Sequence, residues 1–115
     1  MLFRSYDPFP LAEVLAPQAA SLRSYYIRWG DAQVRVISRG AEFSRIRHLR
    51  TGYEMDVLTK YLYGDGETCT INDSTDYVLP LQPGDVVSVV EETSRGVLAK
   101  HNGVSGWYSG PLQKL

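Results

Sequence analysis

Side chains suited to nucleophilic, acid–base or metal chemistry are few in this sequence of 115 residues. His48, His101 and Cys69 each stand alone, without a second histidine or cysteine at the spacing of a metal site. Ser105 lies in Gly-Val-Ser-Gly and not in the Gly-x-Ser-x-Gly elbow of a hydrolase. Glycine-rich phosphate loops and dinucleotide fingerprints are absent as well. We therefore expect a protein that is not an enzyme, with no catalytic residues, no bound metal and no cofactor.

Arginines in the first half form the most distinctive charged group. Residues 1–50 hold eight arginines and four acidic residues, a net charge of +4, whereas residues 51–115 carry a net charge of -5. Arginines can grip phosphates, which makes a nucleic-acid contact surface one candidate function. The overall charge of -1 argues against a nucleic-acid partner, and pairing between the two halves is the simpler expectation. The candidate basic surface comprises Arg35, Arg39, Arg45, Arg47 and Arg50.

Length and composition place these residues in a small globular protein. Apolar residues make up 43% and charged residues 22%, close to the globular average, and the length suits one domain or a small barrel with an extension. No run approaches the 18 apolar residues of a spanning helix, and Asp7 with two prolines interrupts the apolar stretch that a signal peptide needs. We expect a soluble, cytoplasmic protein without a membrane span.

The first half predicts a helix and a strand. Leu22, Tyr25, Tyr26 and Trp29 have the spacing of one helical stripe, and Asp7 with Pro8 suits a helix start, so residues 7–29 are predicted to be helical and to bury that stripe. Residues 32–38 alternate and are β-branched, which indicates a strand. Residues 43–49 have apolar residues at every third position, as in a helical turn. Residues 51–58 fit either a helix or a strand.

The second half predicts short strands separated by turns. We expect strands over residues 59–63, 68–71, 78–81, 86–90, 97–101 and 104–108, with a hairpin turn at Asn102-Gly103, where both residues tolerate positive φ. This pattern is typical of a small barrel or sandwich. The predicted core comprises Leu79, Leu81, Val86, Val87, Val89, Val97 and Leu98.

The segments PGDVVSVVEETSRG, VLAKHNGVSGWY and SGPLQKL resemble the second half of a Src-homology-3 domain. The likeness spans about residues 60–115 and is closest over 79–108. The resemblance implies an SH3-like β-barrel at residues 56–115, and with the predicted helix and strand of residues 1–55 packed on it the fold class is α+β. We expect the two parts to form one cooperative unit.

The resemblance also implies a binding surface, although its groove is degenerate. Such domains bind proline-rich peptides between aromatic rings. Val97 with Leu98 stands where the family has tryptophan, Ser109 where it has proline, and Leu112 nearest to where it has tyrosine. Aromatic residues and an acidic loop in matching places give the candidate partner-binding residues Tyr61, Tyr63, Asp73, Asp76, Trp107 and Tyr108.

The predicted function is therefore a protein–protein interaction module, an adaptor or scaffold that binds another protein through a surface other than the usual proline groove. The alternatives are a structural subunit of an assembly, which would be an oligomer, and a nucleic-acid contact protein that uses the basic segment from Arg35 to Arg50.

Overall fold

The computed structural model describes residues 8–30 and 33–115. These residues form twelve strands and one short 3-10 helix, and none of them forms a helix long and apolar enough to cross a membrane. The elements are β1 (Leu11–Val14), β2 (Tyr26–Ile27), β3 (Gln33–Ser38), β4 (Phe43–His48), β5 (Glu54–Leu58), η1 (Thr59–Tyr61), β6 (Leu62–Tyr63), β7 (Thr68–Ile71), β8 (Ser74–Thr75), β9 (Val86–Thr93), β10 (Gly96–His101), β11 (Val104–Tyr108) and β12 (Leu112–Lys114).

The chain divides into two compact units, one inserted into the other. Unit 1 consists of the two outer parts of the chain, up to Leu22 and from Val78 onward, and unit 2 is the continuous segment Arg23–Tyr77. The boundary that we expected between residues 55 and 56 falls inside unit 2, between adjacent residues of β5. The reason is that β1 pairs with β9 and β12, so the first segment of the chain belongs to the same unit as the last.

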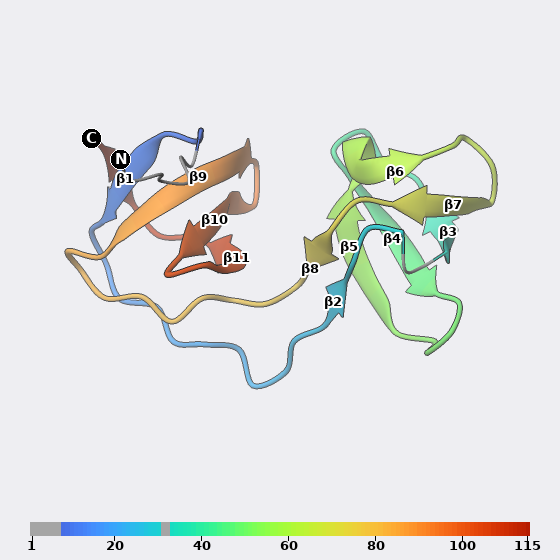
Figure 1. Ribbon diagram of the computed structural model, residues 1–115, viewed down its shortest axis with the longest axis horizontal. Helices are drawn as coiled ribbons and strands as arrows, with labels where there is room; N and C mark the ends of the chain where they lie inside the picture. Colours follow the sequence, from blue (N-terminus) through green and yellow to red (C-terminus); the bar gives the residue numbers. More distant parts are fainter. Residues whose placement is uncertain (1–7, 31–32) are drawn as a thin grey trace, which may run out of the picture. The chain divides into compact units, whose positions relative to one another are not determined.

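Unit 1 is built on a five-stranded sheet with the order β11-β10-β9-β1-β12. Strands β9, β10 and β11 form a meander, and Asn102 and Gly103 take positive φ values of 51° and 80° in the β10–β11 turn, as predicted. The blue strand β1 lies beside the orange β9 in Figure 1, and it also pairs with β12. The predicted strands at 86–90, 97–101 and 104–108 are confirmed, while residues 78–81 form only isolated bridges.

The core of unit 1 matches the sequence prediction in five of seven positions. Leu79, Leu81, Val87, Val89 and Leu98 are buried. Val86 is exposed and Val97 is only half-buried. Val86 points away from the core because side chains alternate along a strand and its neighbour Val87 faces inward.

Unit 2 contains a second five-stranded sheet, with the order β5-β4-β3-β7-β6, and a two-stranded sheet of β2 and β8. Alternating residues of the larger sheet meet in one apolar core and the others face solvent. The buried members of this core are Ile27, Val34, Ile46, Met55, Val57, Leu62, Cys69 and Ile71. The predicted strand at 68–71 is confirmed, as is the strand predicted at 32–38 over its described residues 33–38, and the open segment 51–58 contains a strand.

The two large sheets share one strand arrangement. In each, a three-strand meander (β3-β4-β5 or β9-β10-β11) continues through its first strand to a fourth strand (β7 or β1), which then pairs with a short edge strand (β6 or β12). The difference lies in chain order, because β1 precedes its meander whereas β7 follows its own. The same pairing is thus reached by two different connections.

The predicted helix over residues 7–29 is wrong, and with it the α+β class, since the described residues are almost entirely β (residue 7 lies outside them). The backbone of this segment bonds to distant residues instead of to its own turns. Gln18 and Leu81 exchange backbone hydrogen bonds, Ser21 donates to Val78, and Tyr25 donates to the Asp76 carboxylate. The expected apolar stripe is therefore not buried: Leu22, Tyr26 and Trp29 are exposed.

Two further expectations are corrected. Residues 43–48 form strand β4 instead of the helical turn expected over 43–49, because Ser44, Ile46 and His48 alternate inward. The expected β-barrel over residues 56–115 is also absent from the described part of the chain. The edge strands of each five-stranded sheet do not pair with one another, so neither sheet closes.

Candidate functional site

The six predicted partner-binding residues are divided between the two units. Tyr61, Tyr63, Asp73 and Asp76 belong to unit 2, whereas Trp107 and Tyr108 belong to unit 1.

Tyr108 is a structural residue of unit 1. Its ring is buried, and its hydroxyl donates to the carbonyl oxygens of Ala16 and Pro111 at 2.9 and 3.1 Å and accepts the Ala16 N–H at 3.3 Å. Trp107 is half-buried, and its carbonyl oxygen accepts the Leu79 N–H and the Gln18 side-chain amide. These contacts place both residues in the framework that ties β11 to the segments around it.

Tyr61 and Asp76 have structural contacts in unit 2. Tyr61 packs partly against the apolar core, and its carbonyl oxygen accepts the Asn72 N–H. The Asp76 carboxylate accepts hydrogen bonds from two tyrosines. One oxygen accepts the Tyr25 backbone N–H at 2.9 Å, and the other accepts the Tyr53 hydroxyl. Both residues are half-buried.

A cluster of aromatic and polar side chains surrounds this aspartate contact. The rings of Tyr25 and Tyr53 are stacked with centroids 4.5 Å apart, and the Tyr25 hydroxyl lies 3.1 Å from Nδ1 of the buried His48. The hydrogen bond to Asp76, followed by burial and the charge of that carboxylate, raises the pKa of Tyr53. His48, which the sequence left as an isolated histidine, is thus a core residue with polar partners.

Tyr63 and Trp29 form an exposed aromatic pair, here called the aromatic corner. Their ring centroids lie 5.1 Å apart and the ring planes meet at 71°. The two residues remain 49% and 59% exposed, so each contacts the other while leaving much of its surface in water. Asp73 adjoins the corner, since its carboxylate accepts the Trp29 N–H. The corner therefore combines two of the predicted residues, Tyr63 and Asp73, with a tryptophan that sequence reasoning had assigned to a buried helix.

Trp29 could have been recognised from its neighbour. Gly30 follows it directly and adopts a positive φ of 78°, as expected for a turn residue. A tryptophan beside such a turn has no continuing strand or helix to bury it. The helical spacing of residues 22–29 hid this signal.

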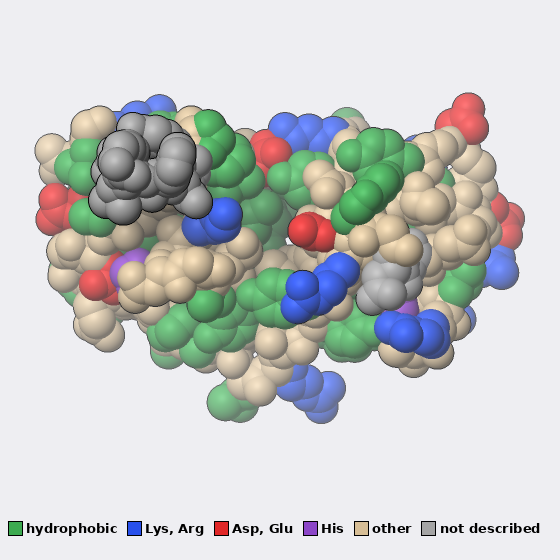
Figure 2. All heavy atoms as spheres, in the orientation of Figure 1, with side chains coloured by type: hydrophobic (Ala, Val, Ile, Leu, Met, Phe, Trp, Pro, Cys, Tyr) green, Lys and Arg blue, Asp and Glu red, His purple; other side chains and the backbone are tan. Residues whose placement is uncertain are grey.

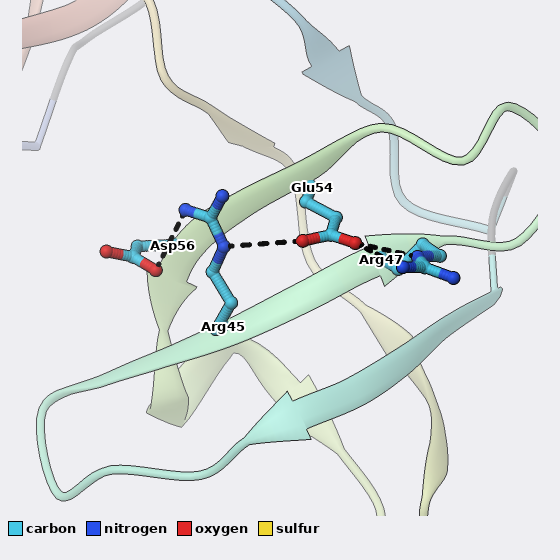
Figure 3. A network of polar contacts seen from close by, with 4 residues as sticks. All are labelled: Arg45, Arg47, Glu54 and Asp56. Atoms are coloured by element: carbon cyan, nitrogen blue, oxygen red, sulfur yellow. Dashed lines mark hydrogen bonds and ion pairs between the residues drawn. The ribbon is translucent and has the colours of Figure 1, made fainter.

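The predicted basic surface lies in unit 2 and is largely paired. Arg45 lies between Asp56 and Glu54, and Glu54 also binds Arg47, so the four side chains form one chain of ion pairs across β4 and β5 (Figure 3). The pairing follows from the register, which sets Arg45 opposite Asp56 and Arg47 opposite Glu54.

The other arginines of this surface have mixed surroundings. Arg35 pairs with Glu67, and Arg39 donates to the carbonyl oxygens of Gly64 and Gly66 at 3.5 and 3.4 Å. Arg50 is exposed. The expected attraction between the positive first half and the negative second half is thus realised as local pairs inside unit 2. On the face seen in Figure 2, acidic and basic side chains are interspersed among apolar and neutral ones.

The cysteine and histidine side chains elsewhere in the described residues do not form a reactive site. Cys69 is a buried thiol in β7, with its sulfur 3.4 Å from the Gly64 carbonyl oxygen. His101 lies at the end of β10, 3.2 Å from the Val86 carbonyl oxygen. Residues 8–30 and 33–115 contain no group of three or more metal-ligating side chains arranged to hold an ion.

No family model, no curated protein and no solved structure matches this chain. The resemblance of residues 79–108 to a Src-homology-3 domain therefore stays a prediction.

Proposed function

We propose that this chain is a protein-interaction module that binds an extended peptide segment of another protein through the aromatic corner. The observation that carries the proposal is the contact of Trp29 with Tyr63 while both remain about half exposed. Tryptophan and tyrosine are the residues that most often dominate the energy of protein interfaces. Single exposed apolar residues are ordinary, but two large aromatic rings held against each other form a ready anchor site.

The location of the corner supports recognition of a peptide in preference to catalysis. It lies at the edge strand β6 and at the turn after β2, where a partner chain can approach without displacing the core. Rigid aromatic side chains lose little conformational entropy on binding, which favours their use as a contact surface.

The proposed surface is not the proline groove that the resemblance implies. Of the residues at the matching positions, Tyr108 is buried and Trp107 is half-buried, both in unit 1, whereas Tyr63 and Asp73 lie in unit 2. The corner is in unit 2, outside the segment 79–108. The module would thus bind through a non-standard surface, as the departures at Val97, Ser109 and Leu112 suggest.

The pairing of the arginines gives less support to the nucleic-acid alternative. Arg35, Arg45 and Arg47 already neutralise carboxylates on the sheet. A phosphate backbone would have to compete with those ion pairs, and the total charge of the chain is -1.

The test uses the full chain as the target for selection from a displayed library of random linear peptides. Selected peptides are resynthesised with a fluorophore, and their Kd values are measured by anisotropy. We expect Trp29→Ala and Tyr63→Ala to weaken binding tenfold or more, since truncated anchor residues typically cost about 2 kcal/mol or more.

The matched control is Ile37→Ala, which removes a side chain of similar exposure (46%) from β3 of the same unit. It should leave Kd unchanged within about twofold. Failure to select any peptide, or selected peptides that bind the two corner variants as tightly as the parent chain, would overturn the proposal.

A further inference from the structure

The aromatic corner has the geometry of two walls that meet. The two rings meet edge to face, with their planes at 71° and their centroids 5.1 Å apart, and both residues remain about half exposed. The face of an aromatic ring carries negative charge density, and tryptophan attracts cations more strongly than any other side chain does through this effect. The corner therefore presents electron-rich surface from two directions.

The acidic residues around the corner have the matching sign. The Asp73 carboxylate is fixed against the Trp29 backbone by a hydrogen bond, and Asp65 is exposed two positions after Tyr63. No ion pair occupies either carboxylate among the described residues, in contrast to Glu67, which binds Arg35. The basic residue nearest in sequence to Trp29 is Arg28, which directly precedes it and is exposed. A carboxylate bonded to the Trp29 backbone, with a second one close in sequence to Tyr63, favours a ligand with positive charge.

We propose that the aromatic corner, with Asp73, binds the quaternary ammonium group of a methylated lysine in a partner protein. The inference rests on the proposed function and names the chemistry of its ligand. A methylated ammonium is compact and weakly hydrated, so it fits into the angle between two rings and gives up little water there. A proline would instead suit a slot between ridges, and a guanidinium would stack flat on one ring.

Asp73 has two roles in the proposed site, one structural and one electrostatic. One oxygen of Asp73 accepts the Trp29 N–H and fixes its position, while the exposed carboxylate keeps its negative charge for the ligand. Asp73→Asn retains a hydrogen-bond acceptor for Trp29 but removes the charge. This substitution thus separates the structural role of Asp73 from its electrostatic role.

The experiment compares three pentapeptides, Gly-Gly-Xaa-Gly-Gly. Xaa is trimethyllysine, its neutral isostere with carbon in place of the quaternary nitrogen, or arginine. Binding to the full chain is followed by the fluorescence of Trp29 in a Trp107→Phe background, because Trp29 and Trp107 are the two tryptophans of the sequence. We expect trimethyllysine to bind about 2- to 30-fold more tightly than the isostere, the range that cation–π attraction supplies between exposed and desolvated sites.

Tyr63→Ala and Asp73→Asn should each reduce this preference toward onefold, and Ile37→Ala should leave it unchanged. Equal Kd values for trimethyllysine and its neutral isostere, or no detectable binding of either, would overturn the inference. So would an arginine peptide that binds as tightly as the trimethyllysine peptide. Library peptides that still bind through Trp29 and Tyr63 would then preserve the interaction module while excluding this ligand.

Discussion

Tyr108→Phe tests whether one hydroxyl group holds unit 1 together. In the folded protein this hydroxyl contacts the N–H and the carbonyl oxygen of Ala16 and the carbonyl oxygen of Pro111. It thereby ties the end of β11 to the chain leaving β1 and to the turn before β12. Phenylalanine keeps the buried ring and removes only these bonds.

The magnitude follows from the groups left without their partner. Pro111 has a second donor, the Leu15 N–H at 3.1 Å, so the loss falls on the two backbone groups of half-buried Ala16. An unsatisfied buried polar group costs about 1–3 kcal/mol, and partial access of water to Ala16 places the total near the lower end, about 2 kcal/mol. In a unit of this size, about 2 kcal/mol lowers Tm by roughly 8–16 °C.

The assay is urea unfolding, monitored by Trp107 fluorescence in a Trp29→Phe background, with the midpoint and slope fitted together. The midpoint should fall at constant slope, which marks a change in stability and not in the unfolded state. Tyr63→Phe is the control, because Tyr63 is half exposed and removing its hydroxyl should cost almost nothing. If Tyr108→Phe loses less than about 0.5 kcal/mol, the hydroxyl is not part of the framework.

Three further predictions concern unit 2. Gly40→Ala should destabilise it by several kcal/mol or prevent folding, because the added Cβ would lie 2.3 Å from a backbone carbonyl oxygen, whereas Gly66→Ala meets nothing closer than 3.9 Å and serves as the control in thermal melts. Because the folded pKa of Tyr53 is raised above the ordinary 10.0, its contribution to stability is complete below that pH and is lost as the pH rises through the folded pKa. The stability of the parent chain should consequently fall more steeply above pH 10 than that of Tyr53→Phe, and parallel urea-midpoint curves would contradict this. Residues 23–77 alone should give a cooperative melt and dispersed amide signals, since they contain their own core; a disordered spectrum would show that they depend on unit 1.

Local sequence signals predicted strands β3, β9, β10 and β11. Asn102-Gly103 fixes the β10–β11 hairpin because both residues accept positive φ, and the alternation of residues 33–38 identifies β3. In the site, Tyr63 and Asp73 were found as binding candidates before the structure gave their relation to Trp29.

The remaining features depend on contacts that leave no local trace. The alternation of β4 is concealed because two of its inward residues, Ser44 and His48, are polar and become buried only by bonding to Thr59 and Tyr25. Residues 7–29 were predicted to be helical from their spacing, yet the backbone donors of Gln18, Ser21 and Tyr25 reach acceptors more than fifty positions away. Long-range pairing of this kind overrides local propensity and cannot be predicted from a single sequence.

The insertion of unit 2 into unit 1 has a consequence for the order in which the chain folds. Ala12 of β1 pairs with Val87 and Lys114, which lie 75 and 102 positions later in the chain. Every strand of unit 2, in contrast, pairs within the segment 23–77. During synthesis unit 2 can form first, while β1 remains without a neighbour. Formation of the Tyr26–Thr75 pair then shortens the loop between β1 and β9 to about two dozen residues, which lowers the entropic cost of closing it by roughly 1 kcal/mol. The inserted unit would thus act as an internal folding aid, and unit 1 should fold more slowly whenever unit 2 is destabilised.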